Sequence, residues 1–260
     1  MGVGHGFLLA VMLWPGASAG ADLPAAPAPV RLTILTEHAP PVGMLEDGHA
    51  NGAGNVVGSG SDKVRELMAR AGVAYSIELQ PWKRAYTAAL TRADHCVFST
   101  TRLPEREALF KWIGPIDRTE WLLLGRADRH YALTTLEDAR KLRIGTYNGD
   151  ARDTFLRERG FNVDPAQDDL TNPQKLLLGR IDLWAASPRR GSMVLEQNGW
   201  TAKIVPVLSM KQVDLYLACH VSVPDALVAR MNAAVEAMNR DGTMKKIDRK
   251  YDAWQAPKAK

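Results

Sequence analysis

The chain has 260 residues, enough to bury one large core or two smaller ones. Its hydrophobic share of 46% and charged share of 24% exclude collagen-like and intrinsically disordered proteins. The formal net charge is only +4, and no dense run of Lys and Arg is interleaved with aromatic residues, so we do not expect a nucleic-acid partner.

The N-terminus resembles a secretory signal peptide. Residues 7–14 form an apolar run, and Ala17-Ser18-Ala19 follows as a cleavage pattern, with a second one ending at Ala21. The run is too short to span a bilayer, and the basic residue that usually precedes it is missing. We expect a signal peptide over 1–21, a disordered leader over 22–29, and export to the periplasm.

Residues 30–35 are apolar and rich in β-formers, which predicts a first strand. Glu37 and His38 stand in its exit loop. The glycine-rich stretch 48–60 does not follow a strand directly and carries a hairpin-like Asn-Gly pair, so we expect neither a phosphate-binding loop nor a cofactor. It leads into a helix that we expect to be capped near residues 61–62 and to end at Gly72.

Residues 73–79 alternate as a second strand. A helix follows from Pro81, which suits a first helical turn, to about Thr91. Trp82, near the start of this helix, either faces a ligand cleft or belongs to the core.

The segment from Asp94 to Pro115 carries the strongest functional pattern. A buried strand over 96–99 opens into a loop that contains Ser99 and Thr101, and a short helix begins near Pro104. Ligands of open α/β sheets bind just beyond the carboxyl ends of strands. These hydroxyls, together with the guanidinium of Arg106, predict an anion-binding site. A loop with solvated arginines is the alternative.

Several motifs resemble periplasmic solute-binding proteins of the polar amino-acid ABC-importer family, which is family 3 of the bacterial extracellular solute-binding proteins. The resemblance covers about residues 30–254 and points to a poorly characterised branch with a P-W-x-R-A motif. The motifs are P-E-R at 104–106, P-W-x-R-A at 81–85, G-R-I-D at 179–182, R-D-G-T at 240–243 and K-I-x-x-K-Y at 246–251.

This resemblance implies a two-lobed α/β fold of the periplasmic-binding-protein type II, with two hinge crossings near 115–120 and 209–216. Lobe 1 is expected over 30–117 plus 216–254, lobe 2 over 118–213, and a tail over 255–260. The alternation of strand and helix segments independently favours α/β layers.

The resemblance also implies ligand contacts. Arg106 would clamp a ligand carboxylate, and Ser99 and Thr101 would add hydroxyl contacts. Ala39 and Val42 replace the usual aromatic lid, so that Glu37 supplies polarity there.

In the second lobe, a strand over 142–146 precedes Asp150, Ala151 and Arg152 at the start of a helix, where free N–H groups and the helix dipole favour an anion. Family members bind the ligand carboxylate at this loop. Because Asp150 replaces a hydroxyl, we expect it to receive a cation or a hydroxyl donor; its alternative role is a simple N-cap.

A helix is expected over 171–178, and a strand after Gly179 runs into Ser187. Ser187 occupies the position where amino-acid binders carry an Asp for the ligand's ammonium group, and a neutral hydroxyl cannot pair with a cation in the same way. Trp184 either lines the cleft or fills the lobe core.

A strand over 213–219 and a helix over 224–239 complete the pattern. In the resembling fold this strand returns antiparallel beside the strand of Cys96, so we expect Cys96 and Cys219 to form a disulfide, which an oxidising compartment permits. Two buried free thiols are the alternative. We expect no metal, because alternating strand side chains prevent His95 and His220 from joining the cysteines around one ion.

The expected function is capture of a small anionic or zwitterionic solute by hinge closure, for an inner-membrane ABC permease, by a monomeric binding protein and not an enzyme. One alternative is a periplasmic enzyme similar to cyclohexadienyl dehydratase, with Glu37, His38 or Asp150 as general acid or base. Another is a sensory binding protein that docks a receptor.

Overall fold

The computed structural model describes residues 1–4, 31–47 and 54–252. The predicted leader (22–29), the tail (255–260) and all of the predicted signal peptide beyond residue 4 fall outside these ranges. Within the described ranges, every helix is too short or too polar to cross a bilayer.

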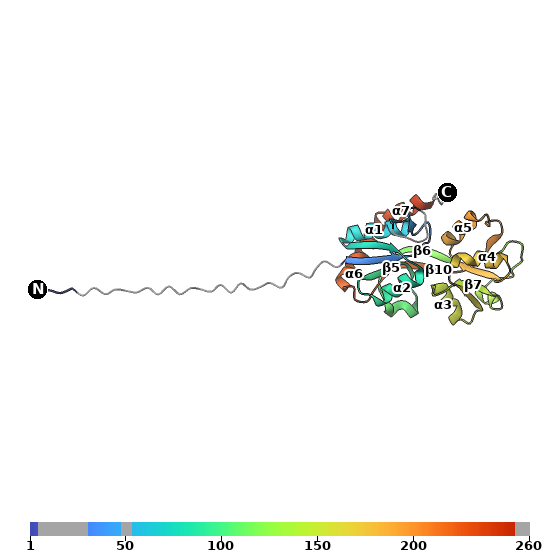
Figure 1. Cartoon of the computed structure of the whole chain (residues 1–260), viewed down its shortest axis with the longest axis horizontal. Helices are drawn as coiled ribbons and strands as arrows, with labels where there is room; N and C mark the ends of the chain where they lie inside the picture. Colours follow the sequence, from blue (N-terminus) through green and yellow to red (C-terminus); the bar gives the residue numbers. More distant parts are fainter. Residues whose placement is uncertain (5–30, 48–53, 253–260) are drawn as a thin grey trace.

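Two α/β lobes lie side by side, as expected from the sequence (Figure 1). Within the described residues, the first lobe contains three parallel strands and four α-helices: β1 (Arg31–Thr36), β4 (Ala74–Leu79), β5 (His95–Thr101), α1 (Ser59–Ala71), α2 (Trp82–Thr91), α6 (Asp225–Arg240) and α7 (Thr243–Asp252). A short hairpin of β2 (Met44–Leu45) and β3 (Val56–Val57) and the 3-10 helix η1 (Pro104–Leu109) also belong to it.

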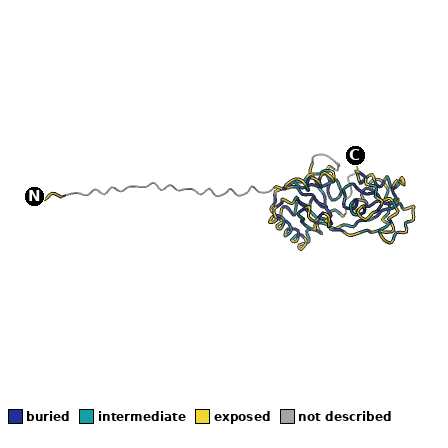
Figure 2. Tube along the Cα trace, turned by 90° about the horizontal axis from the view of Figure 1, so that it is seen from below, coloured by how far each residue is buried: buried dark blue, intermediate teal, exposed yellow. Residues whose placement is uncertain are grey.

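The second lobe is smaller. Its elements are β7 (Ile144–Tyr147), β8 (Val163–Ala166), β9 (Leu183–Ala186), α3 (Ala151–Glu158), α4 (Asn172–Leu177), α5 (Pro188–Gln197) and the 3-10 helices η2 (Leu136–Ala139) and η3 (Asp169–Thr171). Buried positions run through the interior of both lobes, and exposed ones follow the outer loops and helix faces (Figure 2).

Two long antiparallel strands join the lobes: β6 (Lys111–Arg126) and β10 (Ile204–Cys219). They lie in the middle of one eight-stranded sheet with the order β4-β1-β5-β10-β6-β9-β7-β8. β10 is longer than predicted, because the sequence pattern indicated only residues 213–219.

Glycine and proline usually interrupt a strand, but β6 continues through the Gly114-Pro115 pair. Leu215 pairs with Asp117 and Leu217 pairs with Ile113, so residues 114–116 bulge opposite a single residue of β10. Gly114 has a φ of 137°, and a Cβ there would lie 2.9 Å from the Tyr216 ring. A bulge tolerates proline, and glycine allows the close approach of the two strands.

Helix α1 begins three to four residues earlier than predicted. Its N-cap is Gly58, whose φ is 129° and where a Cβ would lie 2.4 Å from the Val42 carbonyl oxygen. Only glycine fits this turn, and it lets the helix start at Ser59. The predicted end is confirmed, with Gly72 in the left-handed conformation.

The predicted disulfide is present. β10 runs antiparallel to β5, Cys219 lies opposite Cys96 in the register, and both cysteines are fully buried in the core of the first lobe. The cysteines are 123 residues apart in the sequence. The bond therefore links the two chain segments that form the first lobe, and the whole second lobe lies in the loop between them.

We expect the Cys96→Ala/Cys219→Ala double variant to lose about 2–5 kcal/mol of unfolding free energy, since the unfolded chain regains the freedom of a long open loop. Urea unfolding of both proteins measures the difference. Reduction of the wild type should lower its midpoint similarly, whereas equal midpoints for variant and wild type would contradict the expected contribution.

Candidate functional site

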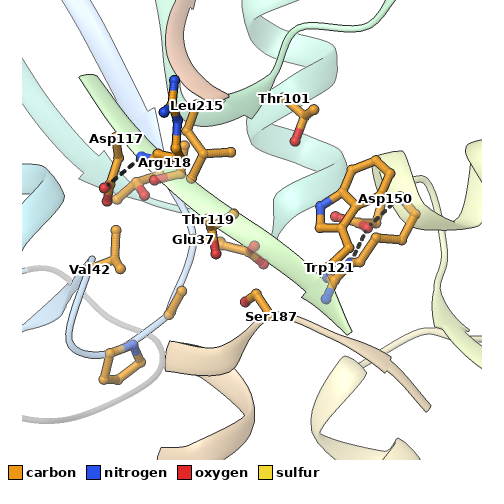
Figure 3. Close-up of a pocket in the computed structure, with 15 residues that line it drawn as sticks. Glu37, Val42, Thr101, Asp117, Arg118, Thr119, Trp121, Asp150, Ser187 and Leu215 are labelled. Atoms are coloured by element: carbon orange, nitrogen blue, oxygen red, sulfur yellow. Dashed lines mark hydrogen bonds and ion pairs between the residues drawn. The ribbon is translucent and has the colours of Figure 1, made fainter. Parts of the chain in front are cut away.

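A cavity of about 100 Å³ lies between the lobes, beside the crossing strands (Figure 3). Its lining comes from both lobes and from β6 and β10: Thr36, Glu37, Ala39, Pro40, Val42, Ser99, Thr101, Asp117, Arg118, Thr119, Trp121, Asp150, Arg152, Ser187 and Leu215. Six residues singled out from the sequence are in this set, namely Glu37, Ser99, Thr101, Asp150, Arg152 and Ser187.

The first lobe contributes the carboxyl ends of two parallel strands. Thr36 ends β1 and Glu37 follows it, while Ser99 and Thr101 lie at the end of β5. Ser99 has a φ of 61°, a left-handed conformation that is rare for serine. Because β1 and β5 are parallel neighbours, their polar ends meet at one edge of the sheet.

Arg106 lies in η1 behind this wall and is only 5% exposed. Its guanidinium carbon is 4.9 Å from the centre of the Tyr86 ring. Its Nη1 is buried and has no hydrogen-bond partner among the described residues. Arg106 is outside the cavity lining, but its charge helps to lower the pKa of Asp150, so the two groups lie within electrostatic range of each other. A buried donor without an acceptor is costly, so an anion that reached this nitrogen would be bound favourably.

The second lobe contributes the start of α3. Asp150 is the N-cap: its Oδ1 accepts a hydrogen bond from the Arg152 amide at 2.8 Å and another from Arg152 Nε at 2.6 Å. Burial alone would raise the pKa of Asp150, but the charge and hydrogen bonds of Arg152 and the charge of Arg106 together lower it below the ordinary value. Asp150 therefore carries a negative charge at neutral pH.

A buried polar network holds Arg152 from behind. Its Nη2 lies 3.5 Å from Asp169 Oδ2, and Asp169 is fully buried. Asp169 Oδ1 also accepts hydrogen bonds from Trp184 Nε1 at 2.9 Å and from Asn172 Nδ2 at 3.0 Å. These contacts fix the guanidinium of Arg152 relative to the body of the second lobe.

This network decides between the two roles expected for Trp184 in favour of the lobe core, so the alternative that it lines the cleft is corrected. Its side chain is fully buried with Leu176, Ile181 and Leu195 in the core of the second lobe. The strand β9 turns position 184 toward the helices α4 and α5, and the indole N–H finds its partner inside the lobe.

Trp82 belongs to a core cluster of the first lobe, which was one of its two expected roles. It is 5% exposed, and its Nε1 donates a hydrogen bond across the lobes to the carbonyl oxygen of Gly149 at 3.2 Å. Tyr147 of the second lobe packs in the same cluster as Trp82. Trp82 thus joins the start of α2 to the loop before α3, and the lobes are in contact beside the cavity.

Sequence reasoning missed the residues that the crossing strands contribute, Asp117 to Thr119, Trp121 and Leu215. Asp117 pairs at 3.3 Å with Lys63, a 2% exposed lysine of α1 that also contacts Asp248 of α7 at 2.8 Å. The expected hinge crossing at 115–120 was the available signal, because residues at a crossing between two lobes border the gap between them.

The low pKa of Asp150 predicts a pH dependence. A carboxyl group whose pKa is lower in the folded chain stabilises the fold above its unfolded pKa near 4, and this contribution is lost as the pH falls through the folded value. We expect the difference in unfolding free energy between wild type and Asp150→Asn to be constant from about pH 5 to 8 and to shrink below about pH 4. Denaturant unfolding across this range tests it, and a difference unchanged down to pH 2 would contradict the assignment.

The family model of the bacterial extracellular solute-binding proteins, family 3, matches residues 32–253. No curated protein matches the sequence.

Solved structures with the same fold are numerous. The sensor domain of a histidine kinase with similarity to periplasmic binding proteins has a TM-score of 0.76 and 17% identity, and the match covers 88% of this chain and 99% of that chain. An ancestral arginine-binding protein bound to arginine has a TM-score of 0.72 and 20% identity, covering 86% and 99%. The GluR0 ligand-binding core from Nostoc punctiforme, in complex with L-glutamate, has a TM-score of 0.70 and 17% identity, covering 85% and 99%. At these identities the likeness establishes the shared two-lobed fold.

Proposed function

Because the chain belongs to family 3 of the bacterial extracellular solute-binding proteins, we propose that it captures a small carboxylated, amino-acid-like solute in the periplasm and delivers it to an ABC importer. The observation that carries this proposal is the buried guanidinium of Arg106. It lies close to a cavity between two lobes, and one of its nitrogens has no hydrogen-bond partner in the described part of the chain.

The arrangement supports capture by hinge closure. Among the elements of the described ranges, only β6 and β10 run through both lobes, and the hydrogen bond from Trp82 to Gly149 closes the gap on one side. Bending of the two strands near the Gly114 bulge would open the cavity, and closure around a solute would exclude water and strengthen its ion pair with Arg106.

The roles of the other residues follow from their chemistry. The hydroxyl groups of Ser99, Thr101 and Ser187 supply hydrogen bonds to a polar solute from both lobes. Glu37 faces the cavity from the loop after β1, and Figure 3 shows its carboxylate between Thr119 and Ser187. A zwitterion would satisfy both Arg106 and these acidic and hydroxyl groups.

A thermal-shift panel of L-arginine, L-glutamine and L-glutamate, with agmatine as the control that lacks the carboxylate of arginine, tests the proposal. A solute that binds only the folded chain stabilises it, by about 2.7 kcal/mol at a solute concentration of 100 times Kd, and therefore raises its melting temperature. At least one amino acid should stabilise the protein, and agmatine should not. Stabilisation by agmatine equal to that by arginine would remove the carboxylate from the proposal, and no shift with any amino acid would contradict it.

A sensory role is the second candidate, because the sensor domain of a histidine kinase shares the fold over nearly its whole length. Deletion of the gene that encodes this protein distinguishes the importer role from the sensory role. Loss of uptake of the labelled solute supports an importer, whereas normal uptake with a lost transcriptional response supports a sensor. Mass spectrometry of the solute after incubation with the protein completes the test, since conversion to a product would indicate an enzyme.

A further inference from the structure

The start of α3 combines two sources of positive potential at the cavity. The first is the N-terminus of this eight-residue helix, whose free amide groups favour an anion. The second is Arg152, which lines the cavity and is 5% exposed. A guanidinium beside a helix N-terminus would hold a carboxylate, sulfate or phosphate group well.

An anion already occupies this position, and it belongs to the chain. The carboxylate of Asp150 accepts hydrogen bonds from the Arg152 amide and from Arg152 Nε, the two donors that a bound anion would use. Figure 3 shows these contacts on the side of the cavity formed by α3. The lowered pKa of Asp150 agrees with a group that stays ionised there.

Arg152 is not free to serve a second anion. Asp169 lies 3.5 Å from its Nη2 and is fully buried, so Asp150, Arg152 and Asp169 together carry two negative charges and one positive charge. On the opposite wall the cavity is lined by a further carboxylate, Glu37. The positive charge of Arg106 lies on the first-lobe side, behind the end of β5. The second-lobe side of the cavity therefore favours a cation or a hydroxyl donor, and Arg106 is the group on the first-lobe side that favours an anion.

We propose that Asp150 determines specificity by filling the anion position at the start of α3 with its own carboxylate, so that the cavity accepts solutes that present a cation or a hydroxyl group to the second lobe and rejects those that present a second anion. The inference rests on the proposed function, because it takes the cavity as the solute site. It orients the solute, with its carboxylate toward Arg106 and a hydrogen-bond donor toward Asp150.

Sulfate provides a test that does not depend on the natural solute. Asp150→Ser keeps a capping hydroxyl and vacates the position, and Asp150→Asn keeps the shape and removes the charge. Asp168→Asn is the matched control, because Asp168 is also an N-cap carboxylate but is exposed and outside the cavity lining. Sulfate affinity is measured by thermal shift against chloride at equal ionic strength, since sulfate also stabilises proteins nonspecifically.

We expect Asp150→Ser to bind sulfate at least tenfold more tightly than the wild type and the Asp168→Asn variant. Asp150→Asn should gain less, because its side chain still accepts the hydrogen bond from the Arg152 amide. No gain in Asp150→Ser, or equally tight binding by the wild type, would overturn the inference. Should Asp150→Ser fail to fold, Asp150→Gly decides, because glycine is tolerated at an N-cap and leaves no side chain in the position.

L-Glutamate and L-glutamine supply the second arm, since they have nearly the same shape and differ by one negative charge. The ratio of glutamine to glutamate affinity should exceed one in the wild type and fall at least tenfold in Asp150→Asn, as measured by calorimetry. An unchanged ratio with measurable binding would overturn the inference. A wild type that binds no amino acid while the variants gain sulfate binding would contradict the proposed function and leave the charge assignment of Asp150 intact.

Discussion

Replacing Arg106 by alanine will abolish the stabilisation of the protein by its solute. The guanidinium is 5% exposed, and Nη1 has no hydrogen-bond partner in the described part of the chain, so a bound carboxylate would complete a desolvated, charge-assisted pair. Truncating one member of such a pair costs about 2–5 kcal/mol, which corresponds to a loss of affinity of roughly 30-fold to several thousand-fold. Calorimetric titration with the best solute of the panel measures it.

Arg102 is the matched control for this experiment. It lies four residues earlier, stacks within 5.7 Å of the Trp112 ring and 5.5 Å of the Tyr216 ring, and pairs with Glu107 at the surface. We expect Arg102→Ala to change the solute affinity by less than about threefold, because exposed ion pairs contribute little. Full binding by the Arg106→Ala variant, or an equal loss in both variants, would refute the role of Arg106 as the solute clamp.

Arg106→Lys separates charge from geometry. Lysine keeps the charge but lacks the planar fork that stacks on Tyr86 and binds a carboxylate through two nitrogens. We expect an affinity between those of the wild type and Arg106→Ala. Unfolding free energies of the three variants equal to that of the wild type would exclude global destabilisation as the cause of the affinity changes.

Features fixed by local chemistry could be predicted from the sequence. The glycine at the end of α1, the strand before Ser99 and the helix after Pro81 each follow from short-range preferences that the fold does not override. The link between Cys96 and Cys219 needed more, namely the antiparallel return of β10 that the family resemblance implied.

Features that depend on partners distant in sequence could not be predicted. The Gly114-Pro115 pair lies within β6 because Asn232 of α6 accepts a hydrogen bond from the Gly114 amide and donates one to the Trp112 carbonyl oxygen. These bonds support the backbone at a bulge where the regular ladder is interrupted. Local preferences predict that the strand ends at this pair. The tertiary contacts instead stabilise a bend within a continuous strand.

The same limit applies to the site. Residues 150 and 152 could be placed at a helix start from the sequence, but their mutual hydrogen bonds depend on the side-chain conformation that Asp169 imposes from η3. A tryptophan such as Trp184 suits a cleft and a core equally well. The position of Asp169 decides between them, because Asp169 accepts the hydrogen bond of the indole N–H inside the lobe.

Replacing Asp169 is therefore expected to have the largest effect of a single substitution on the unfolding free energy. It is fully buried, accepts hydrogen bonds from Trp184 and Asn172, and pairs with Arg152. Asp169→Ala would leave the buried indole N–H without its acceptor and Arg152 without one of its two carboxylates. Removing one partner of a buried pair costs about 3–5 kcal/mol, because the remaining charge is desolvated and uncompensated.

Two variants divide this loss between its causes. Asp168→Ala removes the neighbouring exposed N-cap and should cost only about 1 kcal/mol. Asp169→Asn keeps an acceptor for Trp184 and removes only the charge, so its unfolding free energy should lie between those of wild type and Asp169→Ala. Urea unfolding, followed by tryptophan fluorescence, reports on these differences. If Asp169→Ala were no less stable than Asp168→Ala, the network behind Arg152 would not hold the second lobe together, and the fixed position of Asp150 at the cavity would lose its physical basis.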